Sequence, residues 1–90
     1  MNWFVYIVKC SDNSLYTGIT TDIIRRINEH NTDNLKGAKS LRGKRPVILV
    51  YREKFTNQSK ARKREAAIKN WKRINKIKFI NRSKNKGFTL

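Results

Sequence analysis

The 90-residue chain has one cysteine, one histidine and one proline, and only 6 acidic residues against 22 Lys and Arg. With Cys10 alone, no intramolecular disulfide can form, and with His30 alone, a Cys/His structural zinc site has too few ligands. The two residues also lack the sequence setting of any Cys/His nucleophile family. The core must therefore be held by packing rather than by covalent or metal links.

Long hydrophobic runs are also missing. The longest, Trp3 to Val8, is far below the roughly 20 residues that a membrane-spanning helix needs. No basic stretch precedes it as in a signal peptide, so we expect a cytoplasmic protein with no membrane partner. Ninety residues support one modest core, and we expect a domain over 1–82 followed by a loose basic tail over 83–90.

Acidic residues are scarce and dispersed along the chain. Two-metal hydrolysis requires several carboxylates around ions about 4 Å apart, and a phosphate-binding Gly-x-x-x-x-Gly-Lys loop is absent as well. The formal net charge of +16 repels itself unless a polyanion is near. Nucleic acid is therefore the first partner to expect, and an anionic membrane surface the second.

Apolar periodicity predicts an α+β domain. Residues 3–8 are typical of a central strand, residues 15–20 of its hairpin partner, and Pro46 to Tyr51 of a third strand. Residues 21–31 predict a helix with a buried stripe of isoleucines (Ile23, Ile24 and Ile27), capped by Thr20, Thr21 or Asp22. A stripe from Ala61 to Ile77 predicts one amphipathic helix of about 20 residues. The expected fold is a three-stranded, mainly antiparallel sheet flanked by helices, in the order β-β-α-β-α.

The hairpin register decides whether the two strand tyrosines can act together. Tyr6 and Tyr16 share a face only if the positions of paired residues sum to an even number. A three-residue loop over 12–14 meets this condition, because it pairs Cys10 with Tyr16 and Tyr6 with Thr20. We therefore expect both phenols on one face of the sheet.

One ordered set of residues resembles a known family. Val5-Tyr6-Ile7 precedes Tyr16-Thr17-Gly18 by about ten residues, and Arg26 and His30 follow at spacings of eight and then four. This arrangement resembles the GIY-YIG nuclease domain. Further stretches resemble its small stand-alone bacterial members, the UPF0213 or YazA-like group: Gly37-Ala38-Lys39, Arg45-Pro46, Leu49-Val50-Tyr51 and Arg64 to Trp71. The resemblance covers about residues 3 to 80.

The resemblance implies a metal-dependent endonuclease that hydrolyses DNA phosphodiester bonds. Tyr6 or Tyr16 would activate or position the attacking water, and Arg26 would stabilise charge on the phosphate. Glu65 would hold one divalent metal ion, Mg²⁺ or alternatively Mn²⁺, with no small-molecule cofactor. A phenol with a pKa of about 10 is a poor base at neutral pH, but nearby cations favour its phenolate form.

Each role has an alternative. His30 either assists the water, contacts phosphate, or ends a helix, where a cation is favoured. Glu65 either binds the metal or makes an ordinary i,i+4 pair with Lys69. The whole chain could also be a catalytically silent nucleic-acid-binding module on the same fold, or, as a third and weaker reading, present its last helix to a membrane surface or a partner protein.

Cations in the loop after the first helix and on the last helix are expected to bind phosphates. They are Lys36, Lys39, Arg42, Lys44, Arg45, Lys69, Lys72 and Arg73. They offer no evident code for reading bases, so we expect structure-selective rather than sequence-selective binding. Many members of the family carry Lys after the glycine of the second motif, where this chain has Ile19.

Overall fold

The computed structural model describes residues 1–85. Its strands are β1 (Trp3–Lys9), β2 (Leu15–Thr20) and β3 (Ile48–Phe55), arranged in the order β2-β1-β3. Both strand pairs are antiparallel, so the α+β class and the central position of the first strand are confirmed. The helices are α1 (Ile23–Thr32), the 3-10 helix η1 (Lys39–Lys44), α2 (Gln58–Lys69) and α3 (Arg73–Asn85).

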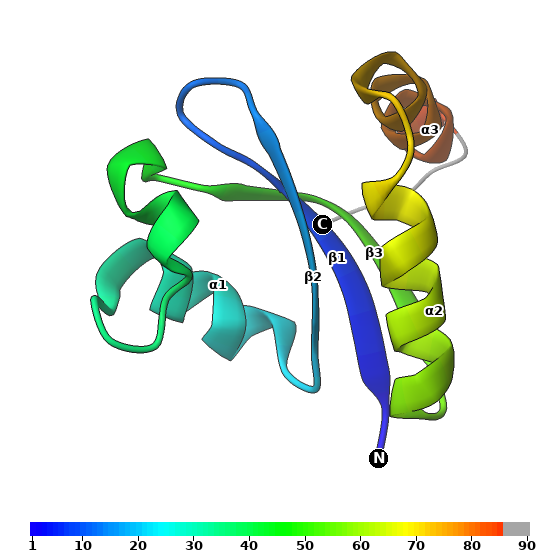
Figure 1. Cartoon of the computed structure of the whole chain (residues 1–90), viewed down its shortest axis with the longest axis horizontal. Coiled ribbons are helices and arrows are strands. Elements are labelled where there is room, and N and C mark those ends of the chain that lie inside the picture. Colours follow the sequence, from blue (N-terminus) through cyan, green and yellow to red (C-terminus); the bar gives the residue numbers. More distant parts are fainter. Residues whose placement is uncertain (86–90) are drawn as a thin grey trace.

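The sheet separates two groups of helices. In Figure 1, α1 and η1 lie on one side of the strands, and α2 and α3 lie on the other. Tyr6 and Val8 belong to a buried cluster with Leu41 of η1, whereas Val5 and Ile7 belong to the cluster that includes residues of α2 and α3. Alternate residues of β1 thus serve two cores, as the period of two in a strand requires.

The hairpin register differs from the expected one by two residues. Tyr6 lies opposite Gly18 rather than Thr20, and the expected pairing of Cys10 with Tyr16 is wrong for the same reason. A shift of two residues preserves parity, so the prediction that both phenols share a face still holds.

A five-residue turn between Lys9 and Leu15 causes this shift. The N–H of Cys10 donates to the carbonyl oxygen of Ser14 over 2.9 Å, and Asn13 adopts a left-handed conformation with φ of 68°. Asparagine tolerates that conformation better than most residues. The turn is therefore longer than the three-residue loop that we expected.

The third strand begins later and ends later than expected. The N–H of Val47 donates to Asn31 Oδ1 over 2.7 Å, and Asn31 Nδ2 donates to the Val47 carbonyl over 3.1 Å. The backbone of Val47 is thus bound to α1 rather than to a neighbouring strand. Pairing with β1 starts at Ile48 and continues to Phe55.

The prediction that Ile24 belongs to the buried stripe of the first helix is wrong. The side chain of Asp22 caps α1 by accepting from the N–H of Arg25, and Ile23 is buried, but Ile24 is 85% exposed. Successive helical residues are about 100° apart, so Ile24 points away from the face that Ile23 and Ile27 present to the sheet.

The single long helix expected near the C-terminus is also wrong, because it is two helices. Asn70 ends α2, and its N–H lies within hydrogen-bonding distance of the Ala66 carbonyl. Since α3 starts in a new direction, Ile80 is buried while Ile74 is 56% exposed. The helix α3 continues to Asn85; residues 86–90 of the expected tail lie outside the described residues. Within 1–85, no helix combines the length and apolar character needed to cross a membrane.

Candidate active site

Three aromatic rings meet on the α1 side of the sheet. Tyr6 comes from β1, Tyr16 from β2 and His30 from α1. The ring centroid of His30 is 6.0 Å from that of Tyr6 and 5.4 Å from that of Tyr16, and the two tyrosine centroids are 6.4 Å apart. The structure thus brings together three residues that the sequence analysis named as candidates.

Gly18 makes room for this cluster. A Cβ added at Gly18 would lie 2.6 Å from the Tyr6 phenol oxygen and 2.7 Å from Tyr6 Cζ. The Tyr6 ring therefore lies directly over the backbone of its cross-strand partner. An isolated glycine inside a strand can signal such a close approach, but the sequence alone did not show which side chain would use the space.

His30 is fully buried, with 0% of its surface exposed. Its Nδ1 accepts a hydrogen bond from the N–H of Ala38 over 3.2 Å, and its Nε2 is 2.7 Å from the phenol oxygen of Tyr6. Burial lowers the pKa of His30 to about 4, and the charge of Arg26 contributes, so the ring is neutral at pH 7. A neutral ring that accepts at Nδ1 carries its proton at Nε2, and His30 therefore donates to Tyr6.

The burial of His30 and its neutral state bear on the roles that the sequence left open for it. A ring with no exposed surface makes no direct phosphate contact in this conformation, and a neutral ring is not a helix-ending cation. The N–H of Ala38, which orients the ring, was not identified from the sequence, because an alanine carries no chemical signal for such a role.

The two tyrosines differ in exposure. Tyr6 is 1% exposed, whereas Tyr16 is partly exposed. Burial raises the pKa of the Tyr6 phenol above its ordinary value, and the neighbouring Tyr16 raises it further, while hydrogen bonding and charge from Arg26 act in the opposite direction. Of the two phenols, that of Tyr16 is the one a substrate can reach directly.

Arg26 is held beside Tyr6 by two contacts from the same nitrogen. Its Nη1 donates to Glu29 Oε1 over 2.9 Å and to the Lys36 carbonyl over 2.6 Å. The side chain is 25% exposed. The guanidinium is therefore fixed in orientation yet still open to solvent on one side.

Glu65 approaches this cluster from α2. Its carboxylate lies close enough to Tyr6 to contribute to the raised pKa of the phenol. Within residues 1–85, the only ion pair of Glu65 joins Oε2 to Lys69 Nζ over 3.6 Å, and its side chain is 22% exposed. The i,i+4 pair with Lys69 is thus present, and Glu65 also lies within electrostatic range of the aromatic cluster.

The donor set for a metal ion is small. Among residues 1–85, no group of three or more His, Cys, Asp or Glu side chains could hold a metal ion together. A single carboxylate fits Mg²⁺ only if phosphate oxygens and water supply most of the shell, which is a common way for this ion to bind. Glu65 fits such a site, in which the nucleic acid itself would provide ligands.

Several cations expected to bind phosphates are engaged within the protein. Arg45 donates from Nε to the His30 carbonyl over 2.6 Å and from Nη2 to the Asp33 carbonyl over 3.2 Å. Arg42 donates to the carbonyl of Asn34. These guanidinium groups bind carbonyls at and just beyond the C-terminus of α1. Among the other loop cations, Lys44 pairs with Asp12 over 3.7 Å, and Lys36 and Lys39 are exposed.

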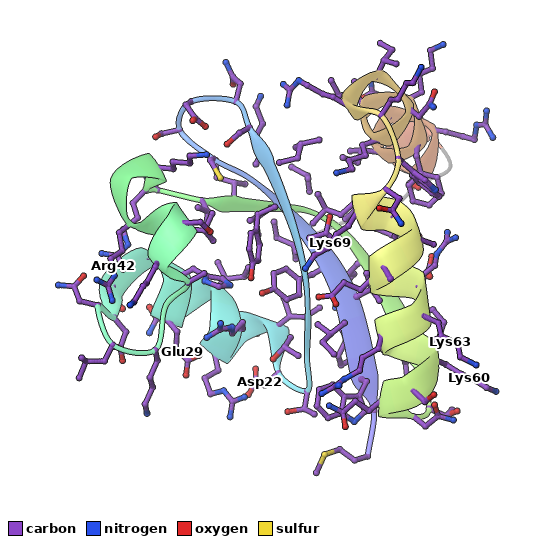
Figure 2. All side chains as sticks on the ribbon, in the orientation of Figure 1. Asp22, Glu29, Arg42, Lys60, Lys63 and Lys69 are labelled. Atoms are coloured by element: carbon purple, nitrogen blue, oxygen red, sulfur yellow. The ribbon has the colours of Figure 1, made fainter. Side chains whose placement is uncertain are left out.

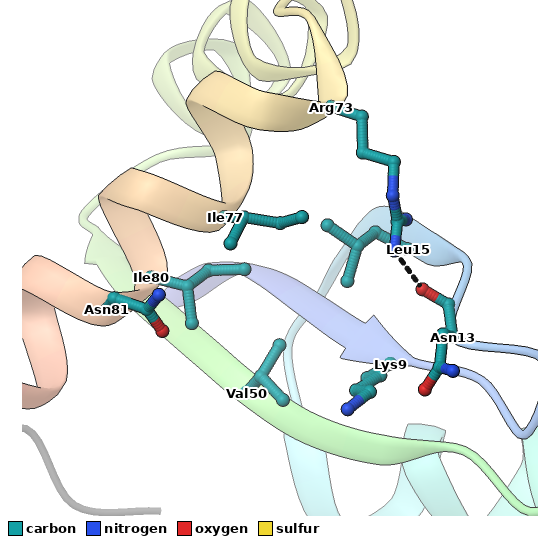
Figure 3. A pocket seen from close by; sticks show the side chains of 8 residues that line it. All are labelled: Lys9, Asn13, Leu15, Val50, Arg73, Ile77, Ile80 and Asn81. Carbon is teal, nitrogen blue, oxygen red and sulfur yellow. Dashed lines mark hydrogen bonds between the residues drawn. The ribbon is translucent and has the colours of Figure 1, made fainter.

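The cations of α2, of α3 and of the turn between them also differ in their surroundings. Arg73 Nη2 donates to the Asn13 carbonyl over 2.7 Å and so closes one end of a cavity of about 370 Å³ between α3 and the sheet (Figure 3). Lys60 and Lys63 extend away from the sheet, whereas Lys69 lies on the side of α2 nearer to it (Figure 2). Lys72 is exposed.

The chain has counterparts among known proteins. A family model described as the GIY-YIG catalytic domain matches residues 2–78. A UPF0213 protein of Desulfotalea psychrophila is 54% identical over 87 residues, covering 97% of this chain and 77% of the relative. One of Staphylococcus haemolyticus is 53% identical over 77 residues, covering 86% of this chain and 92% of the relative.

Solved structures agree with these matches. Solution NMR structures of the UPF0213 protein of Bacillus halodurans and of a protein of E. faecalis superpose with TM-scores of 0.58 and 0.61. Each is 41% identical to this chain and covers 90% of it, with 84% of its own chain covered. The family model and the shared fold thus define a GIY-YIG catalytic domain. The chain belongs to this family and to its UPF0213 group.

Proposed function

We propose that this protein is a metal-dependent endonuclease that hydrolyses DNA phosphodiester bonds and selects its substrate by structure rather than by sequence. The observation that carries the proposal is the convergence of Tyr16, Arg26 and the Tyr6–His30 pair at one place on the sheet. The family match to a catalytic domain supports the reaction class. The net charge of +16 supports a polyanionic substrate.

Tyr16 is the tyrosine that contacts the attacking water in this mechanism, because it is partly exposed. Tyr6 is a positioning residue. Its oxygen accepts a hydrogen bond from the N–H at His30 Nε2, so its own hydroxyl hydrogen is left to donate to a further acceptor. That acceptor would be the water or the oxygen of Tyr16, whose orientation Tyr6 would then fix.

Arg26 would bind the scissile phosphate. Its two hydrogen bonds to protein both use Nη1, so the other guanidinium donors remain available for the Tyr6 oxygen and for a phosphate oxygen. Donors held in place before the reaction stabilise negative charge that develops on the phosphate without having to reorganise. The planar fork of arginine also matches a phosphate better than lysine does.

Glu65 would hold the divalent metal ion together with phosphate oxygens and water. When bound, such an ion would act as a Lewis acid on the phosphate. The proximity of Glu65 to Tyr6 supports a site beside the aromatic cluster. Before the ion binds, the pairing of Glu65 with Lys69 offsets part of the carboxylate charge.

One observation favours the alternative of a silent nucleic-acid-binding module. Burial raises the pKa of Tyr6, so less of this phenol is in its basic phenolate form at neutral pH than for an exposed tyrosine. The alternative differs from the proposal in a single outcome, since a silent module would bind DNA without cutting it under any metal.

The test is a cleavage assay on supercoiled plasmid and on nicked, flapped and branched duplexes, with Mg²⁺, Mn²⁺ or EDTA. We expect metal-dependent cutting that Glu65→Gln abolishes while DNA affinity, measured by fluorescence anisotropy, is kept. Asp12→Asn is the matched control, because it removes a surface carboxylate far along the chain from Glu65. Tight binding with no cutting of any substrate would overturn the proposal in favour of the silent module.

A further inference from the structure

A second cleft runs along one face of α3, on the opposite side of the sheet from the tyrosines. Its volume is about 280 Å³, and it is lined by Trp71, Asn75, Lys78, Phe79 and Arg82. The four residues from α3 are spaced at three and four positions, so they share one helix face. None of the five is acidic, and the cleft therefore combines aromatic rings, an amide and two cations.

The aromatic part of the cleft is held rigidly. The rings of Trp71 and Phe79 meet edge to face with centroids 5.1 Å apart. The guanidinium of Arg64 lies over the Trp71 ring, 5.3 Å from its centroid, and Arg64 Nε donates to Glu53 Oε1 over 2.8 Å. Arg64 does not line the cleft, so it supports the indole from outside while the ring borders the cleft.

The cations of the cleft have no partner within residues 1–85. Neither Lys78 nor Arg82 makes an ion pair with a carboxylate there, and both side chains are exposed. Arg45 and Arg73 differ, because their guanidinium groups are occupied by backbone carbonyls. The two cations are therefore available to contact a ligand at the solvent side of the aromatic cluster.

We propose that this cleft binds an unpaired nucleotide of a nucleic acid, with the base stacked on the Trp71 ring and in edge contact with Phe79, whose ring plane is 78° from that of Trp71. Asn75 would hydrogen-bond to the base edge, and Lys78 and Arg82 would contact the flanking phosphates. Base stacking on aromatic side chains within a positively charged groove is how proteins bind single strands without reading sequence. The proposal rests on the proposed function for the class of ligand and deepens it, since it makes the preferred substrate one with a single-stranded arm.

The position of the cleft fits such a substrate. Tyr6, Tyr16 and His30 lie on the α1 side of the sheet, and α3 lies on the other side (Figure 1). A strand that occupied both places would have to pass around an edge of the sheet. A flap or branch offers two arms that can do this, whereas a straight duplex does not.

Fluorescence tests the proposal directly, because the chain contains only two tryptophans. In a Trp3→Phe background, Trp71 is the sole tryptophan, and a stacked base quenches its emission. We would titrate this variant in EDTA with a 12-nucleotide oligo-dT, with a 12-base-pair duplex and with polyglutamate. Saturable quenching by oligo-dT alone is the expected result, and equal quenching by the duplex or by polyglutamate would overturn the proposal.

Anisotropy with labelled oligo-dT gives a second measurement. Trp71→Leu is expected to weaken binding at least tenfold, whereas Trp71→Phe retains most of the affinity because it keeps a ring. Lys78→Gln and Arg82→Gln should each reduce the slope of log affinity against log salt by about 0.7. Lys60 lies outside the cleft, so Lys60→Gln is the control and should not change the quenching of Trp71 by oligo-dT. Unchanged affinity in a Trp71→Leu protein whose circular dichroism shows that it is folded would also contradict the proposal.

These outcomes are separable from those of the cleavage assay. If the protein binds oligo-dT through Trp71 but cuts nothing, the stacking site stands and the endonuclease does not. If it cuts DNA but Trp71→Leu changes neither the affinity for oligo-dT nor the preference for flapped substrates, the endonuclease stands and the stacking site does not.

Discussion

The phenol oxygen of Tyr6 lies 2.7 Å from Nε2 of His30, and this hydrogen bond joins the central strand to α1. The N–H of Ala38 at Nδ1 fixes which nitrogen carries the proton. Both side chains are fully or almost fully buried, where an unpaired polar atom is costly. The pair therefore stabilises the fold and at the same time defines the geometry beside Tyr16.

The first prediction is the titration of this histidine. His30 is the only histidine in the chain, so its ring resonances can be assigned without mutation. Burial is expected to hold its pKa at about 4, compared with about 6.5 for an exposed ring. The measurement is an NMR titration of the imidazole signals between pH 3 and 8. A midpoint near 6.5 would contradict both the buried position and the proposed tautomer.

The same shift makes stability depend on pH. Because the folded pKa of about 4 lies below the unfolded value, the unfolded chain binds the proton more readily between about pH 6.5 and 4. Stability should therefore fall by about 3 kcal/mol as pH falls through this window, with no contribution above it. Urea unfolding at a series of pH values measures the effect, and His30→Gln should show a flatter profile. An unchanged slope in that variant would assign the pH dependence to other groups.

A glycine substitution tests the close approach beneath Tyr6. Gly18→Ala would place its Cβ 2.6 Å from the Tyr6 oxygen, so the ring or the backbone must move, and we expect the bond to His30 to weaken. We expect a destabilisation of about 1–3 kcal/mol and an altered His30 chemical shift. Gly43→Ala is the matched control, since its added Cβ meets no atom within 4 Å. Equal thermal stability and equal NMR spectra of the two variants would contradict this account.

Arg25 and Arg26 form a natural pair for testing the phosphate ligand. Both contact Glu29, at 3.8 Å and 2.9 Å respectively, but only Arg26 affects the Tyr6 phenol. Arg26→Ala should reduce cleavage at least a hundredfold, the scale seen when one donor to developing charge is removed. Arg25→Ala should reduce it less than threefold, as measured by single-turnover rates on the best DNA substrate. Similar losses for both variants would mean that the two arginines act only through surface charge.

Local patterns predicted the features that depend on strand parity. An even register placed Tyr6 and Tyr16 on one face, and a two-residue error in the loop could not undo that result. The spacing of four between Arg26 and His30 likewise placed both on one side of α1. Parity and helical spacing are local properties, so a single sequence was sufficient to predict them.

Features that depend on direction in space were not predictable in this way. The apolar spacing from Ala61 to Ile77 continues across Asn70 without interruption, yet the chain turns there because Ile80 and Phe79 pack against the sheet. Similarly, nothing in the sequence distinguishes a cation that binds a carbonyl from one that faces solvent. The sequence therefore predicted the same phosphate-binding role for all of the loop cations.

The final prediction compares Arg45, which binds carbonyls, with Lys39, which faces solvent. Arg45 binds the His30 and Asp33 carbonyls, so Arg45→Ala should destabilise the protein by about 1–3 kcal/mol, as expected when charged hydrogen bonds to partly buried acceptors are lost. Lys39 is exposed, and Lys39→Ala should leave stability within about 0.5 kcal/mol of the parent. For DNA binding, we expect the opposite order, with the larger effect in Lys39→Ala. Lys39→Ala should reduce the slope of log affinity against log salt by about 1, since one phosphate contact is lost, and Arg45→Ala should not change that slope while the protein stays folded. If Arg45→Ala reduced the slope and left the unfolding temperature unchanged, the guanidinium would have to leave α1 and bind phosphate in the complex.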